Sequence, residues 1–146
     1  AYELFLSGYN CTQAVVGAFA DVIGMDFDTA VRFSSGFGGG MGRLREVCGT
    51  FSGAVIVVNA LYGYSDPKNI QAKAELYSRI QELAAQFRRD NGSIICKELL
   101  GLSRPEGSPI PEARTDEYYK KRPCPELCRY SANMLEEYIR EHPPVK

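Results

Sequence analysis

Cysteine is the residue type in this chain that could do the most chemistry, and four of the five cysteines lie where a helix is expected to begin. Unpaired backbone N–H groups and the positive end of the helix dipole favour a thiolate there, and the thiolate attacks disulfides or binds metal ions. This placement predicts lowered thiol pKa values and a redox or metal-binding role. The four residues, called the helix-start cysteines below, are Cys11 after Asn10, Cys48 after a glycine-rich stretch, Cys96 shortly after Ser93, and Cys124 before Pro125.

Cysteine is also a common buried apolar residue, so the four thiols could instead be part of the core. Neighbouring cations favour the chemical interpretation, since two arginines precede Cys48 and Lys121 and Arg122 precede Cys124. Cys128 is different because it falls one turn inside the last expected helix, on its apolar stripe. For Cys128 we prefer the core interpretation, with a role as a reserve ligand as the alternative.

Other kinds of cysteine site fit the sequence less well. A chain of 146 residues can bury a conventional core, so the five thiols are not expected to be the staples of a secreted disulfide scaffold. The single histidine, His142, lies close to the C-terminal end of the sequence. It supports neither a Cys-His catalytic pair nor a Cys2His2 zinc pattern.

A glycine-rich segment spans residues 36–43, with the sequence GFGGGMGR. It does not match the phosphate-binding motif G-x-G-x-x-G, lacks the Gly-Lys-Ser/Thr ending of a P-loop, and follows a helical pattern rather than a strand. We expect a loop whose glycines adopt positive φ and approach neighbouring backbone closely, so that N–H groups can point at sulfur or at a bound cluster. Binding of an anionic substrate through Arg43 and Arg45 is a weaker alternative.

Apolar residues recur at helical spacing along most of the chain, which predicts an all-α fold. We expect a single compact domain, residues 1–146, of about five or six helices with the cysteines at helix N-termini. Residues 103–122, rich in proline, are expected to be mostly loop. The expected helices cover residues 10–23, 27–35, 48–62, 67–91 with Asp66 as N-cap, 93–100 with Ser93 as N-cap, and a last one from about 125 to 142.

Composition excludes several classes of function. Seventeen Lys and Arg against 18 Asp and Glu give a net charge of −1, so no surplus of cations is available for nucleic acid. The longest apolar stretch, residues 54–61, is too short to cross a bilayer. We expect a cytoplasmic protein, although the sequence begins with Ala1, which leaves open that a leader has been removed.

Three segments carry a resemblance to a known family: residues 8–15 (GYNCTQAV), 36–43 (GFGGGMGR) and 48–54 (CGTFSGA). They resemble the bacterial and archaeal family of redox-active proteins named for its C_GCAxxG_C_C cysteine pattern. Cys96 and Cys124 would be the remaining cysteines of that pattern, so the match spans nearly the whole chain. The departure is Thr50, where the family usually has alanine, and Cys128 lies outside the pattern.

A related module in split-Soret cytochromes carries an iron-sulfur centre held by cysteines in a homodimer. The resemblance therefore implies an iron-sulfur cofactor, the helix-start cysteines as its ligands, a homodimer, and a separate redox partner protein. It leaves open whether the protein is itself an enzyme. The residues expected around the cofactor are Gly38, Gly39, Gly40, Arg43 and Gly49.

Three hypotheses follow. In the first, Cys48 and two or three of the other helix-start cysteines hold an iron-sulfur centre for electron transfer. In the second, no metal is bound, and Cys48 attacks as a thiolate in thiol-disulfide exchange while another helix-start cysteine resolves the mixed disulfide. In the third, the chain is a structural module for partner binding, with bound zinc or simply an apolar core.

Overall fold

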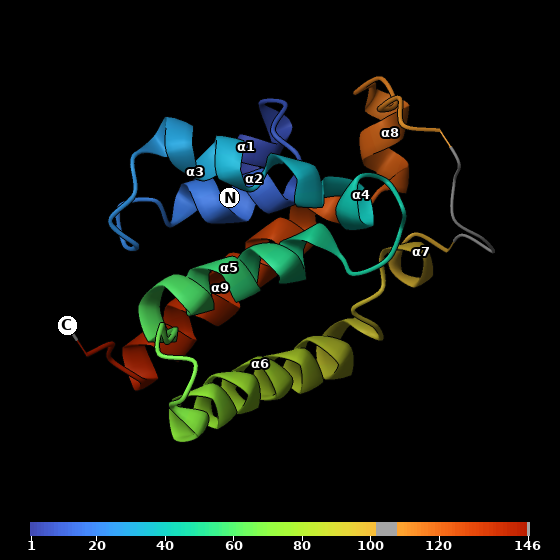
Figure 1. Ribbon diagram of the computed structural model, residues 1–146. Coiled ribbons are helices and arrows are strands. Elements are labelled where there is room, and N and C mark those ends of the chain that lie inside the picture. The colour runs from blue at the N-terminus through green and yellow to red at the C-terminus, as the bar shows by residue number, and fades with distance from the viewer. Residues whose placement is uncertain (102–107, 146) are drawn as a thin grey trace.

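The structure is a computed structural model that describes residues 1–101 and 108–145, and its fold is all-α, as predicted (Figure 1). Two short segments, η1 (Ser35–Phe37) and α4 (Gly38–Met41), connect α3 to the central helices. The other helices are α1 (Tyr2–Leu6), α2 (Cys11–Ala18), α3 (Phe27–Phe33), α5 (Gly49–Tyr62), α6 (Ile70–Asn91), α7 (Cys96–Leu99), α8 (Asp116–Lys121) and α9 (Cys124–Glu141).

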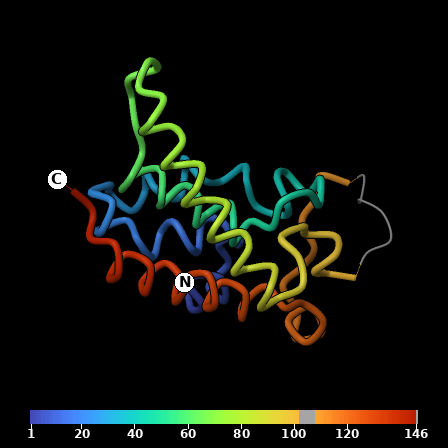
Figure 2. The backbone as a smooth tube through the Cα atoms, turned by 90° about the horizontal axis from the view of Figure 1, so that it is seen from below, coloured from blue at the N-terminus to red at the C-terminus, as the bar shows by residue number. Residues whose placement is uncertain are grey.

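Three helices, α2, α5 and α9, pack against one another, and α6 packs against α5. The two views in Figures 1 and 2 place α4, α7 and α8 together at one end of this bundle. The last turns of α9 lie at the opposite end. The short helices α4, α7 and α8 are therefore grouped around the N-terminal ends of α5 and α9.

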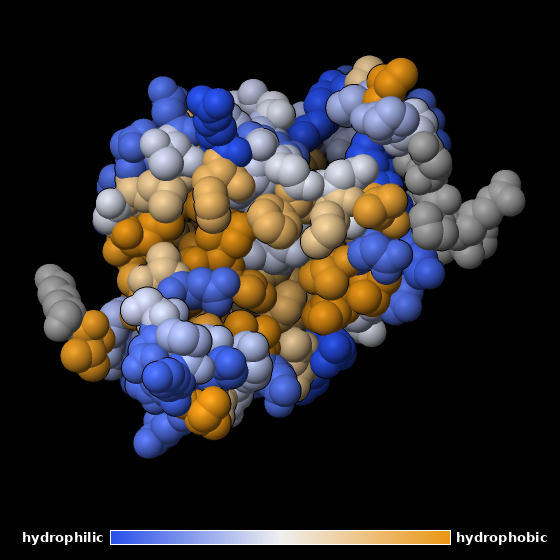
Figure 3. All heavy atoms as spheres, viewed as in Figure 1, coloured by the Kyte–Doolittle hydropathy of each residue, from blue (hydrophilic) through white to orange (hydrophobic). Residues whose placement is uncertain are grey.

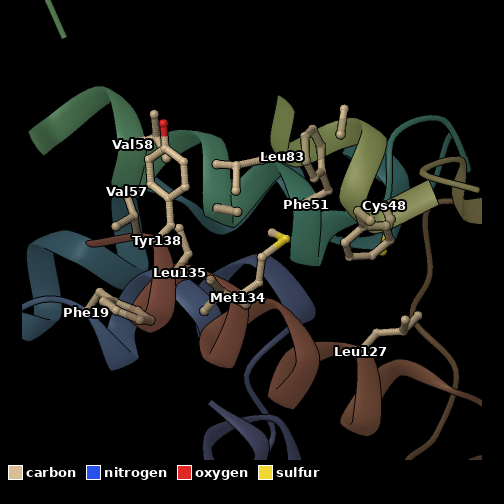
Figure 4. Close-up of a cluster of buried hydrophobic side chains, with 14 of the residues drawn as sticks. Phe19, Cys48, Phe51, Val57, Val58, Leu83, Leu127, Met134, Leu135 and Tyr138 are labelled. Atoms are coloured by element: carbon tan, nitrogen blue, oxygen red, sulfur yellow. The ribbon is translucent and has the colours of Figure 1, made fainter. Parts of the chain in front are cut away.

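The main core lies between α5, α6 and α9, with contributions from α2 (Figure 4). Phe51 of α5 meets Phe87 of α6 edge to face, with ring centroids 5.7 Å apart. Because α5 packs against α2, α6 and α9, apolar residues occupy more than one of its sides, which explains why residues 48–62 show little helical period. The expected helix there is confirmed, with Cys48 as its N-cap.

The first long helix is shorter than predicted. Its start is as expected, because Asn10 forms a reciprocal capping box with Gln13. The helix ends at Ala18, however, and turns follow up to Gly24, which has a φ of 72°. The turns break the helical period, so Val22, expected to face inward, is 52% exposed.

The start of α6 is also different from the prediction. Asn69, not Asp66, is the N-cap, and its side chain accepts a hydrogen bond from the Ala72 N–H at 3.0 Å. Asp66 instead accepts from the Lys68 N–H within a preceding turn. The predicted apolar stripe fails in the first half of the helix, where Ile70 is 66% exposed. The side chains that α6 buries are Leu76, Leu83, Ala84 and Phe87.

Shorter elements account for the remaining differences. Ile95 rather than Ser93 is the N-cap of α7, and Ser93 accepts a side-chain hydrogen bond from the Ile95 N–H. The segment expected to be mostly loop contains α8. Thr115 is the N-cap of this helix, and its side chain accepts a hydrogen bond from the Tyr118 N–H. Residues 102–107 of that segment lie outside the described residues, and α1 was not predicted at all. Among the helices described here, none combines the length and apolar character that crossing a membrane requires.

The close approach of α2 and α5 depends on Gly53. A Cβ atom at this position would lie 2.9 Å from the Val15 Cβ and 3.2 Å from the Thr12 carbonyl oxygen. We predict that Gly53→Ala lowers the free energy of unfolding by about 1–3 kcal/mol, because overpacking outweighs the gain in helix propensity. Urea unfolding monitored by circular dichroism measures this.

Gly36→Ala is the matched control, since a Cβ there meets no atom within 4 Å. It should change stability by less than about 0.5 kcal/mol. A Gly53→Ala variant as stable as the original protein would contradict the described spacing of α2 and α5.

Candidate functional site

The prediction that four cysteines stand at helix starts is confirmed. Cys11, Cys96 and Cys124 are the first residues of α2, α7 and α9, and Cys48 is the N-cap of α5. The helix-start cysteines thus come from four helices that are distant in sequence. All are free thiols, and only Cys124 is more than slightly exposed.

All four helix-start cysteines line one cavity of about 70 Å³, here called the cysteine cavity. Its lining residues come from the end of the bundle where α4, α7 and α8 gather, and Figure 1 shows these helices together. Much of its remaining wall is apolar, and Arg45 and Arg114 supply cations. The other lining residues are Phe5, Asn10, Gly39, Gly49, Thr50, Leu99, Leu100, Tyr118 and Leu127.

Backbone pairing holds Cys48 beside Cys96. The Cys48 N–H donates to the Ile94 carbonyl at 2.7 Å, and the Cys96 N–H donates to the Glu46 carbonyl. An isolated antiparallel bridge joins the residues between them, Val47 and Ile95. This strand-like contact connects the starts of α5 and α7, and nothing in the sequence signalled it.

Gly49 lets Cys11 enter the site. A Cβ atom on Gly49 would overlap Sγ of Cys11 and lie 2.5 Å from Oγ1 of Thr12. Any larger residue would therefore displace the thiol at the start of α2. Thr50, two residues after Cys48, places its hydroxyl oxygen 3.2 Å from the Cys48 sulfur, a contact that the sequence had not indicated.

The glycine-rich segment is not the open loop that was expected. Residues 39–43 and Arg45, called the left-handed segment below, all have φ between 56° and 71°. Three of these residues are not glycine, namely Met41, Arg43 and Arg45, and L-residues adopt this conformation at a cost of roughly 1 kcal/mol each. Hydrogen bonds between its own backbone groups hold it together, including Arg45 N–H to the Gly39 carbonyl at 3.1 Å.

For Gly42, Arg43 and Arg45, these bonds correct the expectation that amides of this segment point at sulfur. The N–H groups of Gly42, Arg43 and Arg45 donate to backbone carbonyls of residues 36–39. The segment instead packs closely against Cys96. A Cβ on Gly40 would lie 2.7 Å from the Cys96 Cβ, so glycine allows the segment to close on α7.

The other residues expected around a cofactor are divided between two places. Gly39 and Gly49 line the cysteine cavity, whereas Gly38 and Arg43 line a neighbouring one. The cation that reaches a thiol is Arg45, which is buried and directs Nη1 to Cys96 Sγ at 3.8 Å. Cys128 does not line the cysteine cavity but lies in a small core with Phe5, Cys11 and Ala14, in agreement with its position on an apolar stripe.

For Cys48, Cys96 and Cys124, the expected lowering of the thiol pKa is wrong. Burial raises the pKa of Cys48 to about 12, with a further increase from Cys11. Burial likewise raises the pKa of Cys124 to about 12, and Cys11 again adds to it. For Cys96, burial raises the pKa even though Arg45 acts to lower it. Loss of hydration thus outweighs the favourable charges, and these thiols are protonated at neutral pH.

The chemistry of the donor set suits soft metals, because four thiols meet at one cavity. In the described ranges, however, no three His, Cys, Asp or Glu side chains form a group that could hold a metal ion as they stand. The sulfurs are therefore neighbours around a space rather than ligands already closed on a point.

The raised pKa values predict that the metal-free protein is destabilised by alkali. Between the ordinary value of 9.0 and about 12, the unfolded chain has lost the Cys48 proton and the folded chain has kept it. Stability should therefore be unaffected by this thiol below pH 9 and fall by about 1.4 kcal/mol per pH unit above it. Chemical unfolding between pH 7 and pH 11 measures the slope.

Cys48→Ala should make that slope shallower without changing the flat region near pH 7. If the two proteins lose stability equally above pH 9, the Cys48 thiol does not titrate abnormally in the folded state.

Comparison with known proteins identifies the family of the chain. Neither the curated proteins nor the solved structures include one that matches the chain. A family model described as "Putative redox-active protein (C_GCAxxG_C_C)" matches residues 9–138, a range that contains all four helix-start cysteines. The chain therefore belongs to the C_GCAxxG_C_C family of redox-active proteins.

Proposed function

We propose that the protein is an electron-transfer protein whose cysteine cavity holds an iron-sulfur cluster through Cys11, Cys48, Cys96 and Cys124. The observation that carries the proposal is the meeting of four thiols, from four separate helix starts, at one cavity. When bound, the cluster would supply a one-electron carrier. The chain supplies the thiols, an apolar wall that limits water, and cations that offset thiolate charge.

The size of the cavity between the thiols favours a cluster over a single zinc ion. Four sulfurs bound to one zinc at 2.3 Å would lie about 3.8 Å from one another. The described side chains include no such closed group, and the cavity of about 70 Å³ is larger than one ion needs. An iron-sulfur cluster divides its cysteine ligands among two or more iron atoms, so it accommodates sulfurs that surround a wider space.

The electrostatics favour metal binding over thiol-disulfide exchange. Exchange requires a thiolate at the pH of the cell, but burial raises the pKa of both Cys48 and Cys124 to about 12. Iron displaces the protons of thiols and brings positive charge. A thiolate bound to iron therefore no longer bears the free-energy cost of being buried as an unpaired anion. Arg45 and Arg114 in the cavity wall would offset the remaining negative charge.

Iron and acid-labile sulfide analysis of anaerobically purified protein tests the proposal. We expect brown protein with stoichiometric iron and sulfide. Alanine replacement of any one helix-start cysteine should lower the iron content severalfold. Cys128→Ala is the matched control and should retain iron, because Cys128 is buried outside the cysteine cavity.

Other outcomes would support the alternatives. Colourless protein that loses two titratable thiols on oxidation would indicate thiol-disulfide exchange between Cys48 and another helix-start cysteine. Tightly bound zinc, or five inert thiols, would indicate a structural module.

We also infer a homodimer, as the family resemblance implies. In support, apolar side chains gather along α5 on the face shown in Figure 3, and Val55, Ile56 and Leu61 of that helix are only partly buried. Light scattering coupled to size exclusion would measure the mass. A redox partner protein and a cytoplasmic location also remain proposals, which pull-down and fractionation experiments would test.

A further inference from the structure

One buried hydroxyl group lies beside a sulfur atom of the site. It belongs to Thr50, in the first turn of α5, two residues after Cys48. The side chain is fully buried, and Thr50 is part of the wall of the cysteine cavity. A hydroxyl taken out of water costs free energy unless it forms a hydrogen bond, so the partner of this group indicates what the residue does.

That partner is the sulfur of Cys48. Oγ1 of Thr50 lies 3.2 Å from Sγ of Cys48, and within residues 1–101 and 108–145 the hydroxyl forms no other hydrogen bond. As a thiol, Cys48 can either donate to the hydroxyl or accept from it. A metal ion takes the place of the thiol proton, and the hydroxyl is then the only possible donor of the pair.

Metal binding should also strengthen this hydrogen bond. A metal-bound sulfur carries negative charge, and hydrogen bonds to charged acceptors are about twice as strong as neutral ones. The hydroxyl therefore stabilises the metal-bound state more than the empty one. Such a difference between the two states is what raises the affinity of a site for its ligand.

The packing of α9 against α5 holds Thr50 in place before any metal binds. Ser131 of α9, which is fully buried, donates from Oγ to the Thr50 carbonyl at 2.7 Å. Threonine is β-branched, so few side-chain rotamers are open to it. The hydroxyl thus has little conformational freedom left to lose when it donates to the sulfur.

Thr12 shows that a buried hydroxyl next to a cysteine does not by itself form such a bond. Thr12 follows Cys11 and is as buried as Thr50. Its Oγ1 has no hydrogen-bond partner among the described residues, and Thr12 is not part of the wall of the cysteine cavity. The contact of Thr50 with sulfur is therefore a particular feature of the start of α5.

We propose that Thr50 is a positioning residue of the metal centre, whose hydroxyl donates a hydrogen bond to the Cys48 sulfur once that sulfur binds a metal ion. The inference rests on the proposed function and adds to it a residue other than the cysteines. Thr50 orients the sulfur and withdraws part of its negative charge. A residue of similar shape without the hydroxyl should therefore bind metal more weakly.

Titration of the metal-free, reduced full chain with cadmium ion tests the proposal. Cadmium is a soft metal that binds thiolates, and its bonds to sulfur absorb in the ultraviolet, so binding is followed directly in competition with a chelator. Thr50→Val, which keeps the branched shape, should weaken cadmium binding about threefold to tenfold. Thr50→Ser, which keeps the hydroxyl, should retain most of the affinity.

Thr12→Val is the matched control, because it removes an equally buried hydroxyl that has no described partner. Its cadmium affinity should be unchanged. General damage to the packing would instead weaken binding in both valine variants, and in Thr50→Ser as well. Urea unfolding of the metal-free variants checks that each one folds, and Thr50→Ala, with the same expected loss, replaces Thr50→Val if that variant does not.

Three results would overturn the inference: equal cadmium affinity with and without the Thr50 hydroxyl, equal loss in the two valine variants, or no cadmium binding by the original protein. The first two leave the iron-sulfur proposal standing, because they concern one hydrogen bond. Absence of iron from the purified protein would contradict the proposed function, and the cadmium titration would still decide the role of Thr50.

Discussion

The site depends on the close packing of α2 and α5, which brings two of the four thiols together. Gly53 allows the backbones to approach in the middle of the pair, and Gly49 allows the Cys11 sulfur to lie against the first turn of α5. The other two thiols are then added at the same end of the bundle. The chain at Cys48 pairs with the start of α7, and α9 packs against both α2 and α5.

Burial makes this convergence costly unless the thiols remain neutral or bind something positive. Two like-charged thiolates in a poorly hydrated cavity repel each other, and each loses the water that stabilised its charge. Arg45 contacts Cys96, but one or two guanidinium groups do not compensate for several anions. The metal centre proposed above would resolve the conflict, because the metal itself would supply the missing positive charge. The same burial that suppresses nucleophilic chemistry therefore favours coordination.

Much of the fold was predictable because it is encoded locally. Caps such as Asn10 and Asp26 and the apolar period of α9 gave the helices and, with them, the cysteines at their starts. The prediction of lowered pKa values for Cys48, Cys96 and Cys124 was wrong because burial is a property of the assembled bundle, not of a helix end. The pairing near Val47 and the position of Arg114 in the cavity wall could not be predicted, since the first is a single bridge and the second lies in a proline-rich stretch without helical period.

The four helix-start cysteines lie between residues 11 and 124, so anything bound to all of them would join distant parts of the chain at one end of the bundle. A ligand that binds the folded chain and not the unfolded one raises the free energy of unfolding by mass action. Loss of such a ligand would therefore be felt first where the short helices gather, and resistance to proteolysis at that end would follow the state of the centre.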